Sequence, residues 1–190
     1  MSSMSLTTSS PALGTALRRL YFVRFGFTVI WAALLFLTGG AAGPFLTILL
    51  IVYPLFDAAS VYWQIRSEGD GRRAKVSEWI NVIVSVLVAI ALGWASTVSA
   101  STALTVWGVW AIAAGLPQLI TAIRNRHTGG QVPQMLSGGI SLFAGGAFVA
   151  QGLQGSGMIV GVAGYALLGA IFFLVSAIRL SIVLRKKVAA

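Results

Sequence analysis

The sequence contains no cysteine, a single histidine and only 4 acidic residues among 190. Without cysteine there is no disulfide, no thiol nucleophile and no cysteine metal site, although this absence does not identify a redox compartment. His127 has no carboxylate near it, which excludes a zinc site. It cannot form a Ser-His-Asp set with Asp57 either, because His127 falls in a polar loop and Asp57 in an apolar segment. We therefore expect no metal, no cofactor and no enzyme activity.

Charge is the second scarce property. Charged residues make up 9% of the chain, whereas a soluble domain carries roughly a quarter. Hydrophobic residues make up 57%, and the mean hydropathy is +0.91. A chain of this composition cannot cover a water-facing surface. It is predicted to be an integral membrane protein, and its length indicates one domain.

Six apolar segments approach or exceed the roughly 20 residues that a membrane span needs. They lie at about 20–38, 44–65, 77–95, 102–123, 134–151 and 158–179. The sequence therefore predicts an all-α transmembrane fold, with a single six-helix membrane domain over residues 17–187. Residues 1–16 are expected to form a mobile cytoplasmic tail and residues 180–190 a basic cytoplasmic tail. A signal peptide competes for the first segment, but the run from Tyr21 to Thr38 is long for one and no clean cleavage site follows.

The basic residues lie in alternate connections between the spans. They are Arg18, Arg19, Arg24, Arg66, Arg72, Arg73, Lys75, Arg124, Arg126, Arg179, Arg185, Lys186 and Lys187. The connections 38–44, 95–101 and 152–157 contain none. Because basic residues stay on the cytoplasmic side, both termini and the second and fourth loops are predicted to be cytoplasmic, in a bacterial plasma membrane. Orientation and contact with anionic lipid head groups account for the net charge of +9, so no nucleic-acid partner is expected.

The spans form three tandem hairpins, at about 20–66, 77–124 and 134–179. Each second helix contains an element that begins with an aromatic residue and ends in Ile-Arg, at 53–66, 110–124 and 165–179, and the copies recur with a period of about 55 residues, as parallel repeats do. The aromatic residues are Tyr53, Trp110 and Tyr165, and the Ile-Arg pairs lie at 65–66, 123–124 and 178–179. In this alignment Asp57 corresponds either to Ala114 and Gly169 or to Gly115 and Ala170. The short turns within the hairpins predict tight antiparallel pairs.

This pattern resembles the HdeD-like bacterial membrane proteins. The resemblance covers about residues 18–187, and it is carried by three tandem helix pairs whose second helices read aromatic-x-x-x-(Asp/Gly) and close on Ile-Arg. It implies a role in survival of acid stress and no established biochemical activity. Two features depart from the family pattern. The aromatic-Pro that often closes the first helix of a pair is represented only loosely, by Pro44, and the intramembrane acid remains only at Asp57.

Asp57 is the most informative candidate for a functional site. It lies nine residues before Arg66, about 13 Å along a helix. An ionisable group at that depth is costly and faces a partner or a water-filled cavity. Arg24 is the expected partner, and Asp57 is either a structural acid or a protonatable group. Asn81, Gln64 and Gln118 are expected to form interhelical hydrogen bonds; a polar track through Asp57, Asn81 and Gln118 is compatible with the spacing, which does not require it.

Small residues mark a second candidate surface, for close helix packing. On the fifth span they are Ser137, Ser141 and Gly145, with Gly138 and Gly146 beside them, and the sixth span adds Gly157 and Gly161. This surface serves either a contact within the chain or a homo-oligomer.

Three functions follow from these observations. The resemblance implies a non-enzymatic membrane protein that contributes to acid or envelope stress tolerance. The alternative is a small transporter or channel for protons or a small solute, with Asp57 as its binding group. Pro54 and Pro117 support that alternative, because interrupted helices often border transport sites. The third function is a membrane scaffold or assembly partner that acts through the glycine-rich fifth and sixth spans.

Overall fold

The structure is a computed structural model that describes residues 11–67, 76–124, 126 and 132–188. It confirms the prediction of six helices, each long and apolar enough to cross a membrane. They are α1 (Pro11–Leu37), α2 (Pro44–Ser67), α3 (Val76–Val98), α4 (Ala100–Arg124), α5 (Val132–Leu153) and α6 (Gly161–Val188). Two boundaries differ from the prediction. Residues 11–16 belong to α1 rather than to a tail, and the basic segment after residue 179 continues α6.

Local sequence explains where the helices begin and end. α2 starts at Pro44, where the missing N–H of proline costs nothing. The Ser99 side chain caps α4 by accepting a hydrogen bond from the Thr102 backbone N–H at 2.9 Å. After α1, Gly39 and Gly40 adopt φ angles of 58° and 71°, which only glycine adopts at no steric cost. α2 and α4 continue through Pro54 and Pro117 as single helices.

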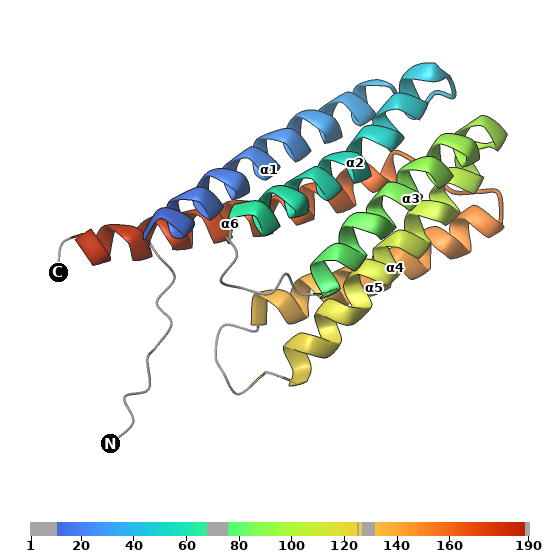
Figure 1. Cartoon of the computed structure of the whole chain (residues 1–190). Helices are drawn as coiled ribbons and strands as arrows, with labels where there is room; N and C mark the ends of the chain where they lie inside the picture. Colours follow the sequence, from blue (N-terminus) through green and yellow to red (C-terminus); the bar gives the residue numbers. More distant parts are fainter. Residues whose placement is uncertain (1–10, 68–75, 125, 127–131, 189–190) are drawn as a thin grey trace.

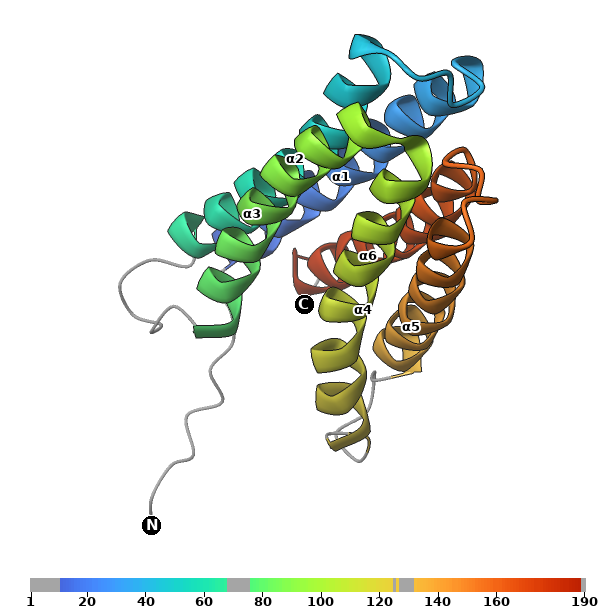
Figure 2. The same ribbon diagram turned by 90° about the vertical axis from the view of Figure 1, so that its right-hand side faces the viewer.

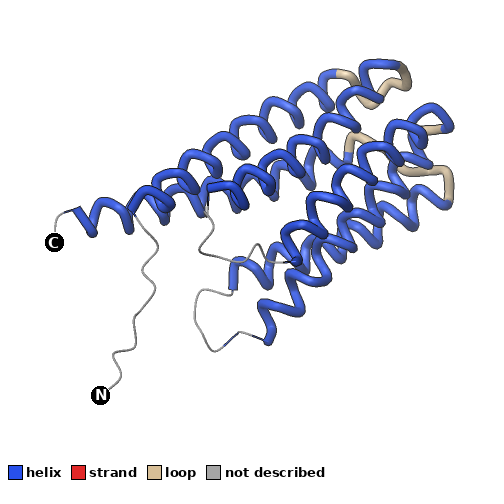
Figure 3. The backbone as a smooth tube through the Cα atoms, in the orientation of Figure 1, coloured by secondary structure: helices blue, strands red, loops and turns tan. Residues whose placement is uncertain are grey.

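The six helices form a closed ring in chain order, because each contacts the next and α6 contacts α1. Figure 3 shows the short connections 38–43, Ser99 and 154–160 together at one end of the bundle, which we call the turn end. The opposite end, where α1 begins and α6 ends, is the loop end. Figures 1 and 2 show the helices spreading apart from the turn end towards the loop end.

The short turns predicted that the two helices of each hairpin pack tightly against each other. These are not the helix pairs with the most extensive contact. The most extensive packing joins α4 to α5, followed by α1 with α6 and α2 with α3, whereas α5 and α6 have the least contact of any neighbours in the ring. A short turn holds two helices together only near the turn. Contact along their length depends on how small the facing side chains are.

Glycines on both helices explain the close approach of α4 and α5. A Cβ atom added to Gly108 would lie 2.6 Å from the Gly145 carbonyl oxygen, and one added to Gly145 would lie 2.7 Å from the Gly108 carbonyl oxygen. Gly115 and Gly138 approach each other in the same way, with the added Cβ 3.0 Å from the partner's carbonyl oxygen in each direction. Side chains at these positions would collide with backbone, so the face is built for this contact.

The residues of the predicted small-residue surface therefore do not all lie on one surface. Ser141 and Gly145 are buried on the α5 face that packs against α4, while Ser137 lines a cavity that is described below. Gly157 lies in the connection before α6 rather than in a sixth helix. Gly161 is exposed, and a Cβ added there would meet only Phe148, at 3.6 Å. The main contact of α5 is with α4 rather than with α6.

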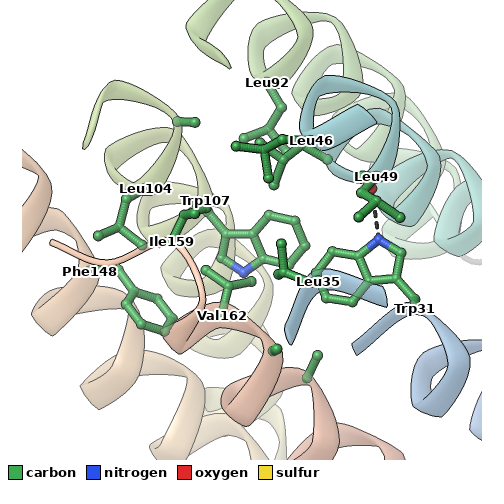
Figure 4. Close-up of a cluster of buried hydrophobic side chains, with 14 of the residues drawn as sticks. Trp31, Leu35, Leu46, Leu49, Leu92, Leu104, Trp107, Phe148, Ile159 and Val162 are labelled. Atoms are coloured by element: carbon green, nitrogen blue, oxygen red, sulfur yellow. Dashed lines mark hydrogen bonds between the residues drawn. The ribbon is translucent and has the colours of Figure 1, made fainter. Parts of the chain in front are cut away.

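A cluster of buried apolar side chains fills the turn end of the ring (Figure 4). Trp31 and Trp107 lie near its centre with ring centroids 5.4 Å apart, and the Trp31 indole N–H donates to the Leu49 carbonyl oxygen at 2.7 Å. Five leucines from α1 to α4 pack around them: Leu35, Leu46, Leu50, Leu92 and Leu104. Phe148 of α5, Ile159 of the connection 154–160 and Val162 of α6 close the cluster. This cluster closes the centre of the ring at the turn end.

The outer surface of the bundle is apolar. Ile30, Ile90 and Phe143 are 64%, 67% and 83% exposed, respectively, and they come from three different helices. An apolar surface that surrounds six helices of membrane-spanning length contacts the hydrocarbon of a bilayer.

We predict that Gly145→Ala destabilises the bundle and that Gly146→Ala does not. The methyl group at position 145 meets the backbone of α4, whereas nothing lies within 4 Å of a Cβ at position 146. The cost of Gly145→Ala should be about 1–3 kcal/mol, as for other overpacked sites. Thermal unfolding of both variants in the same detergent tests this, and equal melting temperatures would show that the α4–α5 contact tolerates separation.

Candidate functional site

A cavity of about 390 Å³ occupies the centre of the ring on the loop-end side of the apolar cluster. All six helices contribute to its wall. Trp107 belongs both to this wall and to the cluster that closes the turn end. Pro133 and Gln134 line the cavity from the first turn of α5 and are themselves exposed, so the cavity opens at the loop end.

An ion pair between Arg24 and Asp57 lies in the cavity wall. The Arg24 guanidinium donates through Nη2 to Asp57 Oδ1, and each side chain is 15% exposed. Ser85, which is fully buried, donates to the other carboxylate oxygen at 3.1 Å. The guanidinium carbon lies 4.3 Å from the centre of the Phe173 ring, a cation–π contact. The pair thus connects α1, α2, α3 and α6.

The structure brings most of the predicted polar residues to this cavity. Asn81 and Gln118 line it together with Asp57, and so do Ser137 and Ser141. Ser141 Oγ lies 2.9 Å from the Tyr165 hydroxyl, within hydrogen-bonding distance. Gln64 is not in the cavity wall. His127 falls outside the described residues.

Two polar atoms of the cavity wall have no hydrogen-bond partner within the described part of the chain. They are the Asn81 side-chain oxygen and the Trp107 indole nitrogen, both buried. An unpaired polar group inside a membrane protein costs free energy, because no water reaches it from the lipid. Water or a ligand in the cavity would supply the missing partners.

Aromatic rings form the deep part of the wall. The Trp107 ring centroid lies 5.3 Å from that of Tyr53 and 5.2 Å from that of Trp110. The ring centroids of Tyr53 and Trp110 are 6.1 Å apart. Tilted and edge-to-face rings at these distances attract one another through their quadrupoles. They form an aromatic, apolar part of the wall.

The cavity also distinguishes between the two repeat alignments. The aromatic residues that start the repeated elements, Tyr53, Trp110 and Tyr165, all line it. Four residues after each, Asp57, Ala114 and Gly169 line it as well. In the other alignment the counterparts are Gly115 and Ala170, which are buried and do not line the cavity. Three equivalent positions thus face one space, and only α2 places a charge there.

Comparison of the chain with protein-family models, curated proteins and solved structures finds no match. The resemblance to HdeD-like proteins therefore stays a proposal. The arguments about function below start from the geometry of the cavity.

Sequence reasoning missed several residues that build the site. Ser85 lies four residues after Asn81, one helical turn further along the same face of α3, and this spacing could have identified it. The glycines of α4 and α5 repeat every seven residues, at 108 and 115 and at 138, 145 and 152, which could have identified the close pair. No sequence signal indicates that Phe173 would lie against Arg24.

We predict that Asp57→Ala destabilises the protein more than Arg24→Ala. Loss of the carboxylate leaves two donors, the Arg24 guanidinium and the Ser85 hydroxyl, without their acceptor. Loss of Arg24 leaves one carboxylate, which still accepts the hydrogen bond of Ser85. Breaking a buried pair by removing one partner costs about 3–5 kcal/mol. Thermal unfolding in detergent measures both changes, with Arg66→Gln as an exposed control; negligible losses for both variants would exclude a structural role of the pair.

Proposed function

We propose that this protein is a non-enzymatic membrane protein that binds a small solute in the central cavity and moves it across the bilayer. The observation that carries the proposal is a cavity lined by all six helices, open at the loop end and closed at the turn end by the apolar cluster. Small-molecule sites are concave and largely apolar, with a few convergent polar groups. This cavity has that composition.

The closed turn end favours a transporter over an open channel. Solute could leave on that side only if the helices around Trp31 and Trp107 separated. A cavity open to one side is one of the two states that an alternating-access cycle requires. The basic residues that the structure describes cluster at the loop end, which we propose to be cytoplasmic under the positive-inside rule. The described state would then face inward.

A scaffold function has lost its main sequence support. The glycines of α5 at positions 138 and 145 are covered by α4 within the same chain, so they are not available to a partner. The small-residue argument for a homo-oligomer weakens for the same reason.

A second candidate, tolerance of acid or envelope stress, rests on the HdeD-like resemblance and on one observation. The Arg24–Asp57 pair and the Ser85 hydrogen bond join four helices. Protonation of Asp57 at low pH would remove the negative charge that holds Arg24, and the packing of these helices would change. Protonation switches of this kind bias a two-state element. The two candidates are compatible, because acid could open or close the transport cycle.

Flux through reconstituted vesicles tests the transport function. We expect wild-type protein to carry protons, reported by an internal pH dye under an imposed potassium potential, or to exchange a trapped small organic acid or amine faster than empty vesicles. Asp57→Asn should slow the flux at least tenfold, the scale on which positioned proton-transfer groups act. Gly146→Ala, which lies outside the cavity, serves as the matched control. Wild-type rates equal to those of empty vesicles for every probe would refute transport.

Survival after acid shock tests the second candidate. In a strain from which the gene is deleted, wild-type protein should restore survival, and Asp57→Asn at matched expression should not. Rescue by both would place the protective element away from Asp57. A deletion strain that survives as well as its parent would remove the stress function.

A further inference from the structure

We propose that the cavity binds a small organic anion with a flat aromatic body, whose carboxylate pairs with Arg24. This inference rests on the proposed function, because it names the chemical class of the solute. It follows from two properties of the wall, the unused donors of Arg24 and the aromatic rings near it, and from the positive charge at the loop end of the bundle.

Within the ion pair, Arg24 has N–H donors that are not in use among the described residues, whereas both carboxylate oxygens of Asp57 are in use. Both oxygens of Asp57 already accept a hydrogen bond, one from Arg24 and one from Ser85. A guanidinium has five N–H donors in a planar fork, and within the described residues Arg24 reaches its partner through Nη2 alone. The remaining donors belong to a side chain that lines the cavity and is 15% exposed, and a fork of this shape matches a carboxylate bidentately.

A second donor without a partner belongs to the deep end of the cavity wall. The indole N–H of Trp107 is buried, its side chain is 0% exposed, and it has no partner among the described residues. A solute would reach this donor only if neighbouring side chains moved aside. A solute that carries carboxylate or carbonyl oxygens provides acceptors, whereas an ammonium ion provides none.

The deep wall favours a flat aromatic body. Tyr53, Trp107 and Trp110 lie within ring-contact distance of one another, between 5.2 and 6.1 Å. Rings in this arrangement bind another ring by stacking or edge contact. A cavity of about 390 Å³ is large enough for a substituted benzene ring and a few waters.

Positive charge at the loop end of the bundle favours anions. The basic residues that the structure describes lie towards this end and outnumber the described acidic ones, and among them Arg24 lines the cavity. An excess of one sign of charge raises the local concentration of the opposite charge. Asp57 would repel an incoming carboxylate, but Arg24 separates the two when each occupies a different edge of the guanidinium.

Binding to the purified full-length chain in detergent tests the proposal with three probes of one shape: benzoate, benzamide and benzyltrimethylammonium. Titration calorimetry should show benzoate binding at least tenfold more tightly than either other probe, the difference expected from charge-assisted bidentate bonds. Arg24→Gln should weaken benzoate binding by a similar factor, and Arg24→Lys, which keeps the charge without the fork, should restore only part of it. Arg66→Gln, an exposed arginine outside the cavity, is the control.

Thiol labelling in the presence of the ligand tests the same site without changing Arg24. The chain contains no cysteine, so only a cysteine introduced by mutation reacts. Ala114 and Ala113 are adjacent and both exposed, but only Ala114 lines the cavity. Benzoate should slow the labelling of Ala114→Cys by a water-soluble thiol reagent and leave Ala113→Cys unchanged. Equal effects on both would place the ligand outside the cavity.

The outcomes separate this inference from the proposed function. Tighter binding of the cation or the neutral amide would overturn the anion and leave transport standing. Failure of all three probes, with flux of another solute through vesicles, would overturn the inference alone. Failure of all three probes together with the absence of any flux would overturn both.

Discussion

The cost of an unpaired charge in an apolar interior is the constraint on which the centre of this bundle depends. Arg24 and Asp57 enter the membrane on different helices, and neither ion is tolerable there alone. Their pairing, completed by Ser85 and Phe173, sets the relative positions of α1, α2, α3 and α6. It also keeps polar groups facing the middle of the ring. The helices cannot close over that space with apolar side chains, so a cavity remains.

The helices pack differently at the two ends of the bundle. At the turn end, large side chains such as Trp31 and Leu50 interdigitate, and no passage remains between them. At the loop end the helices spread apart, although α4 and α5 stay in contact because glycines at 108, 115, 138 and 145 let their backbones meet. A rigid α4–α5 pair beside a more open region suits a protein that changes its opening from one side of the membrane to the other.

The repeated elements place equivalent residues around one space but give them unequal chemistry. An aromatic ring and, one turn later, a small or acidic residue face the cavity from each of α2, α4 and α6. A symmetric arrangement of three acids around a small apolar cavity would force charges of one sign together, which raises the cost of ionisation. One acid with one arginine avoids that repulsion. The result is a single site with a charged side and two apolar sides.

The sequence by itself determined the number of spans and the membrane class, and it placed most helix ends within a few residues; the exceptions are the start of α1 at Pro11 and the end of α6 at Val188. The spans and the class depend on the hydropathy of continuous segments and on the cost of burying charge, which are local properties. Only the tertiary structure decided that Gln118 and Ser137 share a cavity with Asp57 while Gln64 does not, and that α5 packs on α4 rather than α6. In a membrane, the side of a helix that faces lipid and the side that faces other helices are both apolar. The spacing of apolar residues therefore does not show which side meets a neighbouring helix. That choice depends on the fit of small residues between helices distant in the sequence, and it appears only when all six are packed together.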